Sequence, residues 1–600
     1  MRRFLLIFCC IPMFSGAADW STPSEESNYR TTPNYEETMA YIRRIAEAAP
    51  DRVKLEAFGS SGQGRTLWTV IVGRDGVFTP QAARNANRAI VLIQNGIHAG
   101  EIDGKDASLA LLRDIVITKT HAALLDRAVI LIVPVYNVDG HERISRHNRI
   151  NQNGPEEMGW RTTAVNLNLN RDYIKADCPE TRAFLKLWKR WLPDFFFDNH
   201  VTDGADYQYD ITYGVDHGPD VYPDLARWLE ASVFPYVEQS VGKTGHMIGP
   251  FVNFVDEHDP TKGLTIGQSP PRFSTGFTIL QNRPGMLVEM HMLKDYKTRV
   301  TGNYELLRAT LEVINRDAET LLRINRAADA ATEKDGRTGG TIALNVDPTG
   351  ETKPFLFDGI GFEISESDIS GGKRIEYTGE PLTQTIPMQS KLKITRSVKM
   401  PAAYIIPVEW IQLIDVIEAH GLIVQRTKEA FTTEVELYSC FLPEWNPKPF
   451  EGRHTASFDG TPMGDAGFTI PAVRKEACFL ETHNITYAAG SVIVPMTQRA
   501  AKVAVHFLEP QGPDSAVAWG FVDSIFEQKE YGENYVLEKL ARKMLQSDPN
   551  LKREFERRLA ADPDFAASRS ARLNFFFNRS PYRDHRIGLY PVGRLKHIPK

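Results

Sequence analysis

The chain has 600 residues, of which 42% are hydrophobic and 24% are charged. These fractions are near the averages of soluble globular proteins and exclude a disordered chain, while the length predicts more than one domain. The formal net charge of −6 at pH 7 is small for such a length, which argues against nucleic acid as the main partner.

The N-terminal residues have the pattern of a signal peptide. Arg2 and Arg3 precede an apolar run from Phe4 to Phe14, and small residues follow at positions 15–17. We therefore predict a signal peptide over residues 1–17 and a secreted or periplasmic protein. The apolar run is too short to span a bilayer, and no later stretch approaches the roughly 20 apolar residues of a membrane helix. The mature chain is thus predicted to have no membrane span.

Three cysteines follow the predicted signal peptide: Cys178, Cys440 and Cys478. They are too few for a disulfide framework, and their odd number leaves at least one of them unpaired within the chain. A disulfide between Cys440 and Cys478 is one option that this number leaves open.

From Tyr35 to about residue 330, apolar runs alternate with amphipathic segments, the pattern of an α/β layer fold with a mixed sheet. The apolar runs are short and continuous, as in strands that are covered on both faces. They are Ala89–Gln94, Ala128–Val135, Phe195–Phe197 and Met286–Val288. Between them, Asp106–Ile117 and Pro179–Trp191 carry apolar residues at helical spacing and predict helices.

The second half of the chain has a different pattern. A polar, glycine-bearing stretch, Ala327–Gly340, predicts a linker, and Gly340–Leu344 and Lys391–Thr395 beyond it alternate like strands. Phe521–Ala561 has helical periodicity, and a loop-like tail with Pro581, Gly588 and Pro591 follows. We expect a signal peptide (1–17), a large α/β domain (18–330), a β-rich accessory domain (331–520) and a helical C-terminal region (521–600).

Short polar signatures follow the buried runs, where open α/β sheets place their ligand sites. His98 and Glu101 lie after the first run, three residues apart, so one turn can direct both side chains at one ion. Zinc prefers nitrogen and oxygen ligands, and a catalytic site uses three protein ligands and a water. His200, which ends Asp198-Asn199-His200 after the phenylalanine run, is the best third ligand. Each piece alone is common by chance, but their joint placement after two strands favours a metal site.

Further motifs resemble the zinc carboxypeptidase family, the funnelin-type metallopeptidases, in which HxxE and a distant histidine hold one catalytic zinc. Asn170-Arg171 looks like the family's pair that binds the terminal carboxylate of the substrate. Arg161 lies where the family has the arginine that polarises the scissile carbonyl, and Glu289 matches the catalytic glutamate of the last strand. Other matching segments are Gly59–Arg65, Asn137–Gly140 and Pro179–Thr181.

This resemblance covers roughly residues 35 to 300. It implies an exported bacterial multidomain member of the family, with one Zn²⁺ per catalytic domain. The implied fold is a mixed eight-stranded sheet flanked by helices, followed by a β-rich C-terminal domain with a helical end.

The chemistry of these side chains agrees with the roles that the resemblance implies. A carboxylate beside zinc, here Glu289, accepts a proton as the activated water attacks an amide. The Arg161 guanidinium keeps its charge at any working pH and stabilises the negative oxygen of a tetrahedral intermediate. Arg171 offers a planar fork to a carboxylate, and Asn170 adds a donor. The sequence therefore predicts an exported zinc metallopeptidase that hydrolyses peptide bonds and releases C-terminal residues.

Simpler interpretations of the two arginines remain open. Arg171 can instead form a salt bridge with Asp172 or Glu180. Three neighbouring arginines compete with Arg161 for its role: Arg143, Arg146 and Arg149.

Two positions depart from the family pattern. Asn168 stands where the family often has a carboxylate that hydrogen-bonds a ligating histidine, and an amide raises the basicity of the ring less. The family's mobile tyrosine has no counterpart, because the stretch before Glu289 offers only Phe273 and Phe277, which cannot donate a hydrogen bond. Three tyrosines after His200 could supply a hydroxyl, although a buried loop position is the simpler interpretation: Tyr207, Tyr209 and Tyr213.

His291 lies two residues after Glu289, on the same strand face, and is interpreted as a supporting residue. There is no HExxH helix and no Gly-x-Ser-x-Gly elbow, and the glycine loop near Gly59 precedes the strand-like Thr66–Val72. A serine hydrolase or a nucleotide-binding protein therefore lacks support.

The predicted partner is a peptide or protein substrate, and neither the preferred C-terminal residue nor the oligomeric state follows from the sequence. Two alternative functions stay open. An amidase or endopeptidase acting on cell-wall peptides would use the same zinc chemistry. A catalytically impaired peptide- or glycan-binding protein is motivated by the missing tyrosine and the large C-terminal part.

Overall fold

The computed structural model describes residues 19–599, apart from residues 203, 252, 442 and 459–477. The predicted signal peptide, residues 1–17, lies outside the described residues. Within the described ranges, no helix combines the length and the hydrophobicity that crossing a membrane requires. We refer below to residues 19–338 as the first region and to residues 341–599 as the second region.

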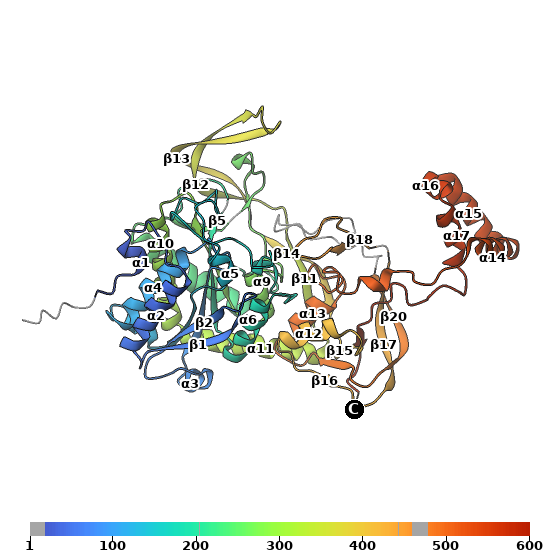
Figure 1. The fold of residues 1–600 in the computed structure, drawn as a ribbon, viewed down its shortest axis with the longest axis horizontal. Coiled ribbons are helices and arrows are strands. Elements are labelled where there is room, and N and C mark those ends of the chain that lie inside the picture. The colour runs from blue at the N-terminus through green and yellow to red at the C-terminus, as the bar shows by residue number, and fades with distance from the viewer. Residues whose placement is uncertain (1–18, 203, 252, 442, 459–477, 600) are drawn as a thin grey trace, which may run out of the picture.

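An eight-stranded mixed sheet forms the centre of the first region (Figure 1). In sheet order its strands are β1 (Val53–Ser60), β2 (Thr66–Val72), β4 (Ala128–Val133), β3 (Ala89–Asn95), β5 (Phe195–Thr202), β10 (Gly285–His291), β6 (Ile211–Val215) and β7 (Ile248–Pro250). Strands β4, β3, β5 and β10 run parallel, and β1, β2 and β6 are antiparallel to the neighbours that connect them to this core. The predicted α/β fold with a mixed eight-stranded sheet is confirmed.

Alternate residues of the buried strands face two layers of helices. On β3, Val91 and Ile93 belong to one core cluster, whereas Ile90 and Leu92 belong to another. The first cluster includes residues of α2 (Tyr35–Ala48), α4 (Asp103–Val116), α8 (Phe234–Gly242) and α10 (Tyr296–Arg316). The second includes residues of α3 (Pro80–Asn85) and α6 (Pro179–Trp191). The continuous apolar sequence of β3 follows from this two-sided burial.

Helix α11 (Ala318–Thr338) occupies most of the stretch 327–340 that the sequence predicted to be a linker, so that prediction is wrong. Ala328 and Thr332 are buried, whereas Lys334 and Arg337 are exposed. The polar residues that resemble a loop in the sequence are therefore the solvent-facing side of an amphipathic helix.

Gly336 also misled the linker prediction. It is buried in α11, and a Cβ atom at this position would lie 1.9 Å from the carbonyl oxygen of Met496. The glycine permits close packing of the helix on the second region and is not a flexible joint.

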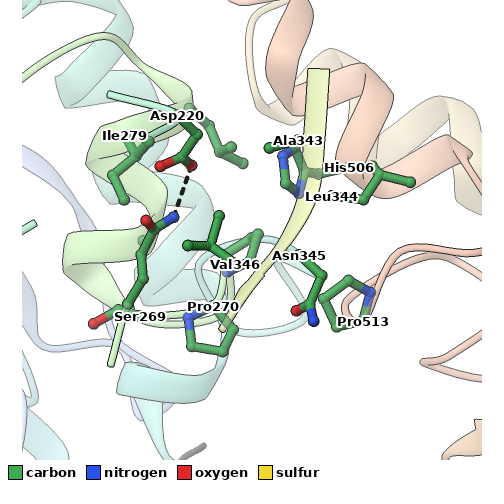
Figure 2. A pocket seen from close by; sticks show the side chains of 14 residues that line it. Asp220, Ser269, Pro270, Ile279, Ala343, Leu344, Asn345, Val346, His506 and Pro513 are labelled. Atoms are coloured by element: carbon green, nitrogen blue, oxygen red, sulfur yellow. Dashed lines mark hydrogen bonds between the residues drawn. The ribbon is translucent and has the colours of Figure 1, made fainter. Parts of the chain in front are cut away.

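Only two residues separate α11 from strand β11 (Thr341–Pro348), which enters the second region. Figure 2 shows Ala343 to Val346 of β11 between Ile279 of α9 (Ser274–Leu280) and His506 of α13 (Ala501–Leu508). The cavity left at this seam is about 20 Å³, which is room for roughly one water molecule. The two regions are thus closely packed here.

The second region contains a six-stranded sheet. In sheet order its strands are β16 (Gln425–Arg426), β21 (Val492–Pro495), β15 (Ala403–Ile406), β22 (Gly593–Leu595), β17 (Phe431–Cys440) and β20 (Cys478–Tyr487). Helix α12 (Ile411–Ala419) and α13 contribute Leu413, Ile417 and Val503 to its core.

A disulfide joins Cys440 of β17 to Cys478 of β20, which lie opposite each other in the antiparallel pair. This is the pairing that the cysteine number left open. Cys178 is a free, buried cysteine. The bridge closes a loop of 38 residues, for which the chain-entropy argument gives a stabilisation of about 4 kcal/mol.

Strand β22 lies in the middle of this sheet, between β15 and β17, where the sequence predicted a loop-like tail. Its Arg594 forms a buried salt bridge with Glu509, which also accepts hydrogen bonds from the hydroxyls of Tyr404 and Tyr438, the latter at 2.7 Å. The tail prediction is therefore wrong for Gly593–Leu595. A segment of three residues with a central arginine does not look like a buried strand in the sequence, because the acid that neutralises Arg594 lies elsewhere in the chain.

The predicted helical end is present as a separate bundle, coloured red in Figure 1, which stands away from the rest of the molecule. Its helices are α14 (Asn534–Ser547), α15 (Pro549–Ala561), α16 (Pro563–Ala567) and α17 (Arg569–Phe577). They have small cores of their own, which include Leu537, Phe565 and Phe576.

A long hairpin extends from the second region toward the first. It consists of β12 (Lys353–Glu366) and β13 (Lys373–Gln389), and β13 also pairs with β9 (Leu264–Thr265) of the first region. Phe357 of this hairpin packs with Tyr207 and Tyr209, which follow the end of β5. Strands β11 and β14 (Leu392–Lys399) pair at its base and confirm the strands predicted near residues 340 and 391.

Candidate metal centre

Three buried side chains converge at the C-terminal ends of two neighbouring parallel strands. His98 and Glu101 lie between β3 and α4, and His200 lies on β5, one residue after Asn199, which pairs with Asn95 of β3. His98 Nδ1 is 3.1 Å from Glu101 Oε2 and 3.2 Å from His200 Nδ1. His200 Nδ1 is 3.0 Å from Glu101 Oε2. These three donor atoms form a nearly equilateral triangle, which we call the donor triangle.

The donor triangle fits zinc. Ligands about 2.0–2.2 Å from a tetrahedral zinc ion lie roughly 3.3–3.6 Å from one another, close to the distances seen here. Two imidazoles and one carboxylate are also a ligand set that catalytic zinc uses. Among the residues that the structure describes, no other group of three His, Cys, Asp or Glu side chains meets the same proximity test.

The far ring nitrogens of both histidines have fixed partners. His98 Nε2 lies 3.0 Å from the side-chain oxygen of Asn168, and His200 Nε2 lies 2.8 Å from a carboxylate oxygen of Asp198. Such contacts hold each ring so that Nδ1 faces the donor triangle. Asn168 therefore contacts a ring of the donor triangle although it is an amide and not the carboxylate that is frequent in the family pattern.

Burial and neighbouring charges set the protonation of the donor triangle. Burial, together with the nearby Arg161, lowers the pKa of His98 to about 3, so its ring is neutral and able to bind a metal. Burial acts against ionised Glu101, but hydrogen bonds from His98 and His200 and the charge of Arg149 outweigh it and hold the pKa of Glu101 well below its usual value. Burial also acts against a charged His200 ring, but Asp198 and Glu101 outweigh it and raise the pKa of His200.

Two arginines contact the second oxygen of Glu101. Arg149 Nη2 lies 2.9 Å and Arg161 Nη1 lies 3.2 Å from Glu101 Oε1. The Arg149 side chain is 9% exposed and also donates to Gln152, whereas that of Arg161 is 34% exposed. Of the competing arginines, the structure thus brings Arg149 to the site, and it leaves Arg161 the more accessible of the two. Arg143 instead lies over the ring of Trp160.

Glu289 lies on β10, directly opposite His200 of β5 in the parallel pair. Residues in register on adjacent strands point to the same face, so Glu289 shares the face of the donor triangle. It is half-buried. His291 is buried on the same face, with Nε2 3.2 Å from Asp206 and Nδ1 accepting from the Leu293 amide at 3.1 Å. His291 thus lies on the face that carries Glu289 and has partners of its own.

Asn170 and Arg171 lie in a short 3₁₀ helix, Leu169–Arg171, next to His200. The side-chain oxygen of Asn170 accepts from the Ser274 amide at 2.9 Å, and its nitrogen is 3.4 Å from His200 Nε2. The Arg171 guanidinium stacks 4.2 Å from the ring centre of Phe273 and donates to the Asn170 carbonyl at 2.7 Å. Phe273 belongs to the stretch before Glu289 in which the family's tyrosine has no counterpart. In this protein its ring instead supports the guanidinium of Arg171.

The carboxylates that could have competed for Arg171 are engaged elsewhere. Asp172 pairs with Lys175 at 2.6 Å, and Glu180 accepts from the Gly62 amide at 2.8 Å. Both acids thus have partners other than Arg171.

The three candidate tyrosines differ in what their hydroxyls meet. Tyr213 donates to Glu238 at 2.8 Å, and the Tyr209 hydroxyl accepts from the Asp358 amide at 3.2 Å. Tyr207 is buried against His291, with ring centres 4.4 Å apart. Burial raises the pKa of Tyr207 to about 12, although hydrogen bonds to Thr202 and Thr212 oppose the shift. Thr212 is in register with Glu289, so Tyr207 covers the sheet face that carries Glu289.

A cavity of about 720 Å³ opens next to this face. Leu287, two residues before Glu289, lines it together with Gly214, which is opposite Leu287 on β6. Its walls also include Phe251, Thr275 and Lys353, the last from the hairpin of the second region. The volume is large enough for an amino-acid side chain and more of a peptide.

Comparisons with known proteins agree with this geometry. Residues 38–204 match the Zinc carboxypeptidase (Peptidase_M14) family. The matched segment contains the donor triangle, Arg161, Asn170 and Arg171, and it ends before Glu289.

Two curated relatives and one solved structure illustrate the similarity. "Carboxypeptidase 2" of Trichophyton tonsurans is 22% identical over 525 residues, which cover 84% of this chain and 86% of the relative. "Carboxypeptidase A6" of Mus musculus is 27% identical over 150 residues, or 24% of this chain and 32% of the relative. Carboxypeptidase A from Helicoverpa armigera aligns with a TM-score of 0.36 and 18% identity, covering 50% of this chain and 75% of that chain. The similarity to the fungal relative therefore extends into the second region.

Proposed function

Because the chain belongs to the zinc carboxypeptidase family and is a peptide-bond hydrolase of that family, we propose that it is an exported enzyme that removes C-terminal residues from peptides. We propose residues 18–330 as its catalytic domain. The observation that carries the proposal is the donor triangle with Glu289 in register beside it.

His98, Glu101 and His200 are the proposed zinc ligands. Zinc held there supplies a water of pKa near 7 and polarises a carbonyl oxygen. Glu289 accepts the proton of the attacking water and passes it to the leaving nitrogen, as a half-buried carboxylate on that face can do.

Arg161 is the proposed stabiliser of the negative oxygen that develops on the attacked carbonyl. Its guanidinium reaches Glu101 but is about one-third exposed, so it can turn toward a bound substrate. Arg149 is more buried and has a second partner in Gln152, which keeps it on Glu101.

Arg171 and Asn170 are the proposed binding group for the terminal carboxylate. The stack on Phe273 holds the plane of the Arg171 guanidinium, and a planar fork matches the two oxygens of a carboxylate. The cavity along Leu287 is the proposed binding site for the C-terminal side chain. Recognition of a free chain end is what separates an exopeptidase from an endopeptidase.

Export is part of the proposal. It is supported by the signal-peptide pattern of residues 1–17 and by the disulfide between Cys440 and Cys478, since disulfides persist mainly in oxidising compartments.

The test is zinc analysis of the mature protein, combined with mass spectrometry of peptide mixtures digested by the wild type, by Glu289→Gln and by Glu434→Gln. Glu434 is an exposed glutamate of β17 and serves as the matched control. We expect the wild type and the control to remove single C-terminal residues stepwise from the peptides. Glu289→Gln should retain zinc but cleave the peptides about 10²–10⁴-fold more slowly.

C-terminally amidated copies of the same peptides distinguish the related activities. We expect them to be poor substrates, because Arg171 then meets no carboxylate. Internal cleavage, or equal cleavage of amidated peptides, would contradict the exopeptidase proposal and favour an amidase or endopeptidase. Bound zinc without any turnover would favour a peptide- or glycan-binding protein.

A further inference from the structure

A turn of the second region contacts the segment that orients the zinc-binding histidine. The turn connects β18 (Glu444–Trp445) and β19 (Ala456–Ser457), an antiparallel pair. At its tip, a carboxylate oxygen of Glu451 accepts a hydrogen bond from the backbone amide of Asn168 at 2.7 Å. The two residues are 283 positions apart in the chain, so this is a contact between the two regions.

Asn168 passes this contact on to the donor triangle. Its side-chain oxygen accepts from the Asn170 amide at 2.9 Å and lies 3.0 Å from His98 Nε2. Asn168 is buried. Its backbone amide is bound by Glu451 and its side chain faces His98, so the position of the ring depends on where Glu451 holds the backbone.

The turn is built to dock at this place. Glu451 has φ +48, in the left-handed region that residues other than glycine rarely adopt, and Gly452 follows with φ +77. Such a conformation persists where surrounding contacts fix it. A Cβ atom on Gly452 would lie 3.2 Å from Leu167, so the turn lies directly against the residue before Asn168.

A second anchor holds the turn on the first region. Arg453 donates to both carboxylate oxygens of Asp177, at 2.8 and 2.7 Å, and its guanidinium lies 3.8 Å from the ring centre of Phe521. Asp177 in turn pairs with Lys175. The two-point contact fixes both the position and the direction of the turn, which a single flexible ion pair would not do.

We propose that Glu451 is a positioning residue of the zinc site, acting through the Asn168 backbone on the His98 ring. The second region thereby supplies part of the active-site framework. The inference rests on the proposed function, because it assigns His98 to zinc. An amide partner raises the basicity of a ligating histidine less than a carboxylate does, so the orientation of this ring carries more of the affinity.

Three substitutions separate the features of Glu451 that matter. Glu451→Gln keeps an acceptor at the same reach, Glu451→Asp keeps the charge but shortens the side chain, and Glu451→Ala removes both. Glu444→Ala, at an exposed glutamate of the same hairpin, is the matched control. Folding is checked by circular dichroism and thermal melting of the zinc-free proteins.

The first measurement is the zinc dissociation constant of each zinc-free protein, by competition with a chelating indicator. We expect Glu451→Ala to weaken zinc binding by about 10-fold or more and Glu451→Asp by several fold, with Glu451→Gln within about threefold of wild type. The control should bind zinc as wild type does. With zinc saturating, kcat should be highest for Glu451→Gln, lower for Glu451→Asp and lowest for Glu451→Ala, while KM changes little.

Wild-type zinc affinity and kcat in both the Ala and the Asp variant would overturn the proposal. So would a Gln variant as impaired as the Ala variant, because the hydrogen bond would then not be the route. If the Ala variant does not fold, the contrast between Asp and Gln decides. The zinc measurement needs no turnover, so a wild type that binds zinc and cleaves nothing would reject the proposed function and leave this test intact.

Discussion

Each region buries a compact cluster of ionisable side chains, but the two clusters are satisfied in opposite ways. In the second region Glu509 is surrounded by donors: Arg594 and the hydroxyls of Tyr404 and Tyr438. In the first region the donor triangle points three ligand atoms, 3.0–3.2 Å apart, at a common point.

This difference separates a structural cluster from a binding site. The Glu509 cluster is complete within the protein, since each charge has its partner, and it fixes β22 in the sheet. The donor triangle collects electron pairs, and two arginines already occupy the other oxygen of Glu101. A cation is what completes such a set.

The largest effect that would sharpen this comparison is expected at Glu509. Glu509→Ala leaves the Arg594 charge buried without its partner and should lower the free energy of unfolding by about 3–5 kcal/mol. Urea unfolding of the zinc-free proteins measures the loss. The zinc dissociation constant of the variant that remains folded should equal that of wild type. If Glu509→Ala instead weakened zinc binding and left the free energy of unfolding unchanged, the Glu509 cluster would be the binding site and its structural role would be wrong.

The reciprocal experiment changes the donor triangle. Free zinc at about a thousand times its dissociation constant should raise the free energy of unfolding of the wild type by about 4 kcal/mol. It should not stabilise His200→Ala at the same concentration. Thermal or urea unfolding with and without zinc tests this, and equal stabilisation of the two proteins would place the metal elsewhere.

The disulfide gives a third contrast, because it stabilises the second region without touching the metal centre. Replacing Cys440 and Cys478 together by serine should cost about 3–4 kcal/mol, from the 38-residue loop that the bridge closes. Zinc content and the cleavage rate at low temperature should not change. Loss of zinc from a folded double variant would show that the second region controls the site more tightly than its stability implies.

A smaller effect is expected from pH. Burial lowers the pKa of His420 to about 4, and its Nε2 donates to the Ile174 carbonyl at 2.9 Å across the seam. The folded pKa lies below the unfolded value of about 6.5, so the stabilisation is present above pH 6.5 and is lost as pH falls toward 4. Between pH 6.5 and 5 this group should cost about 1.5 kcal/mol. His420→Gln should lose that much less on acidification, and an identical loss would refute the assignment.

The smallest effect concerns Arg171. Arg171→Lys keeps the charge but loses the planar fork, so KM for peptides with a free C-terminus should rise about 10-fold with little change in kcat. Steady-state kinetics on free and amidated peptides measures it, and the amidated peptides provide the control. An equal rise in KM for both would mean that Arg171 does not meet the terminal carboxylate.

The local parts of the candidate site could be predicted from the sequence, and the parts that depend on distant contacts could not. His98, Glu101 and His200 follow apolar strands at recognisable spacing, and parallel strands bring such ends together. Glu451 contacts Asn168 from 283 residues away, and it lies in no recognisable motif.

The two errors in the fold have related causes. The polar face of α11 looks like a linker until its packing partner is known, and Gly336 looks flexible although it is held against Met496. The strand around Arg594 could not be predicted from the sequence, because the charge of Arg594 is neutralised by Glu509, which lies 85 positions earlier in the chain. In each case the deciding interaction is a tertiary one.

The absence of a linker at the seam affects how well the chain resists cleavage by other proteases. Proteolytic nicking concentrates at exposed, loosely held chain segments. Between Ala318 and Pro348 the backbone passes from helix to strand through only Gly339 and Gly340. The seam therefore offers little for a protease to cut, and the two regions should stay joined in one piece in a protein-degrading environment.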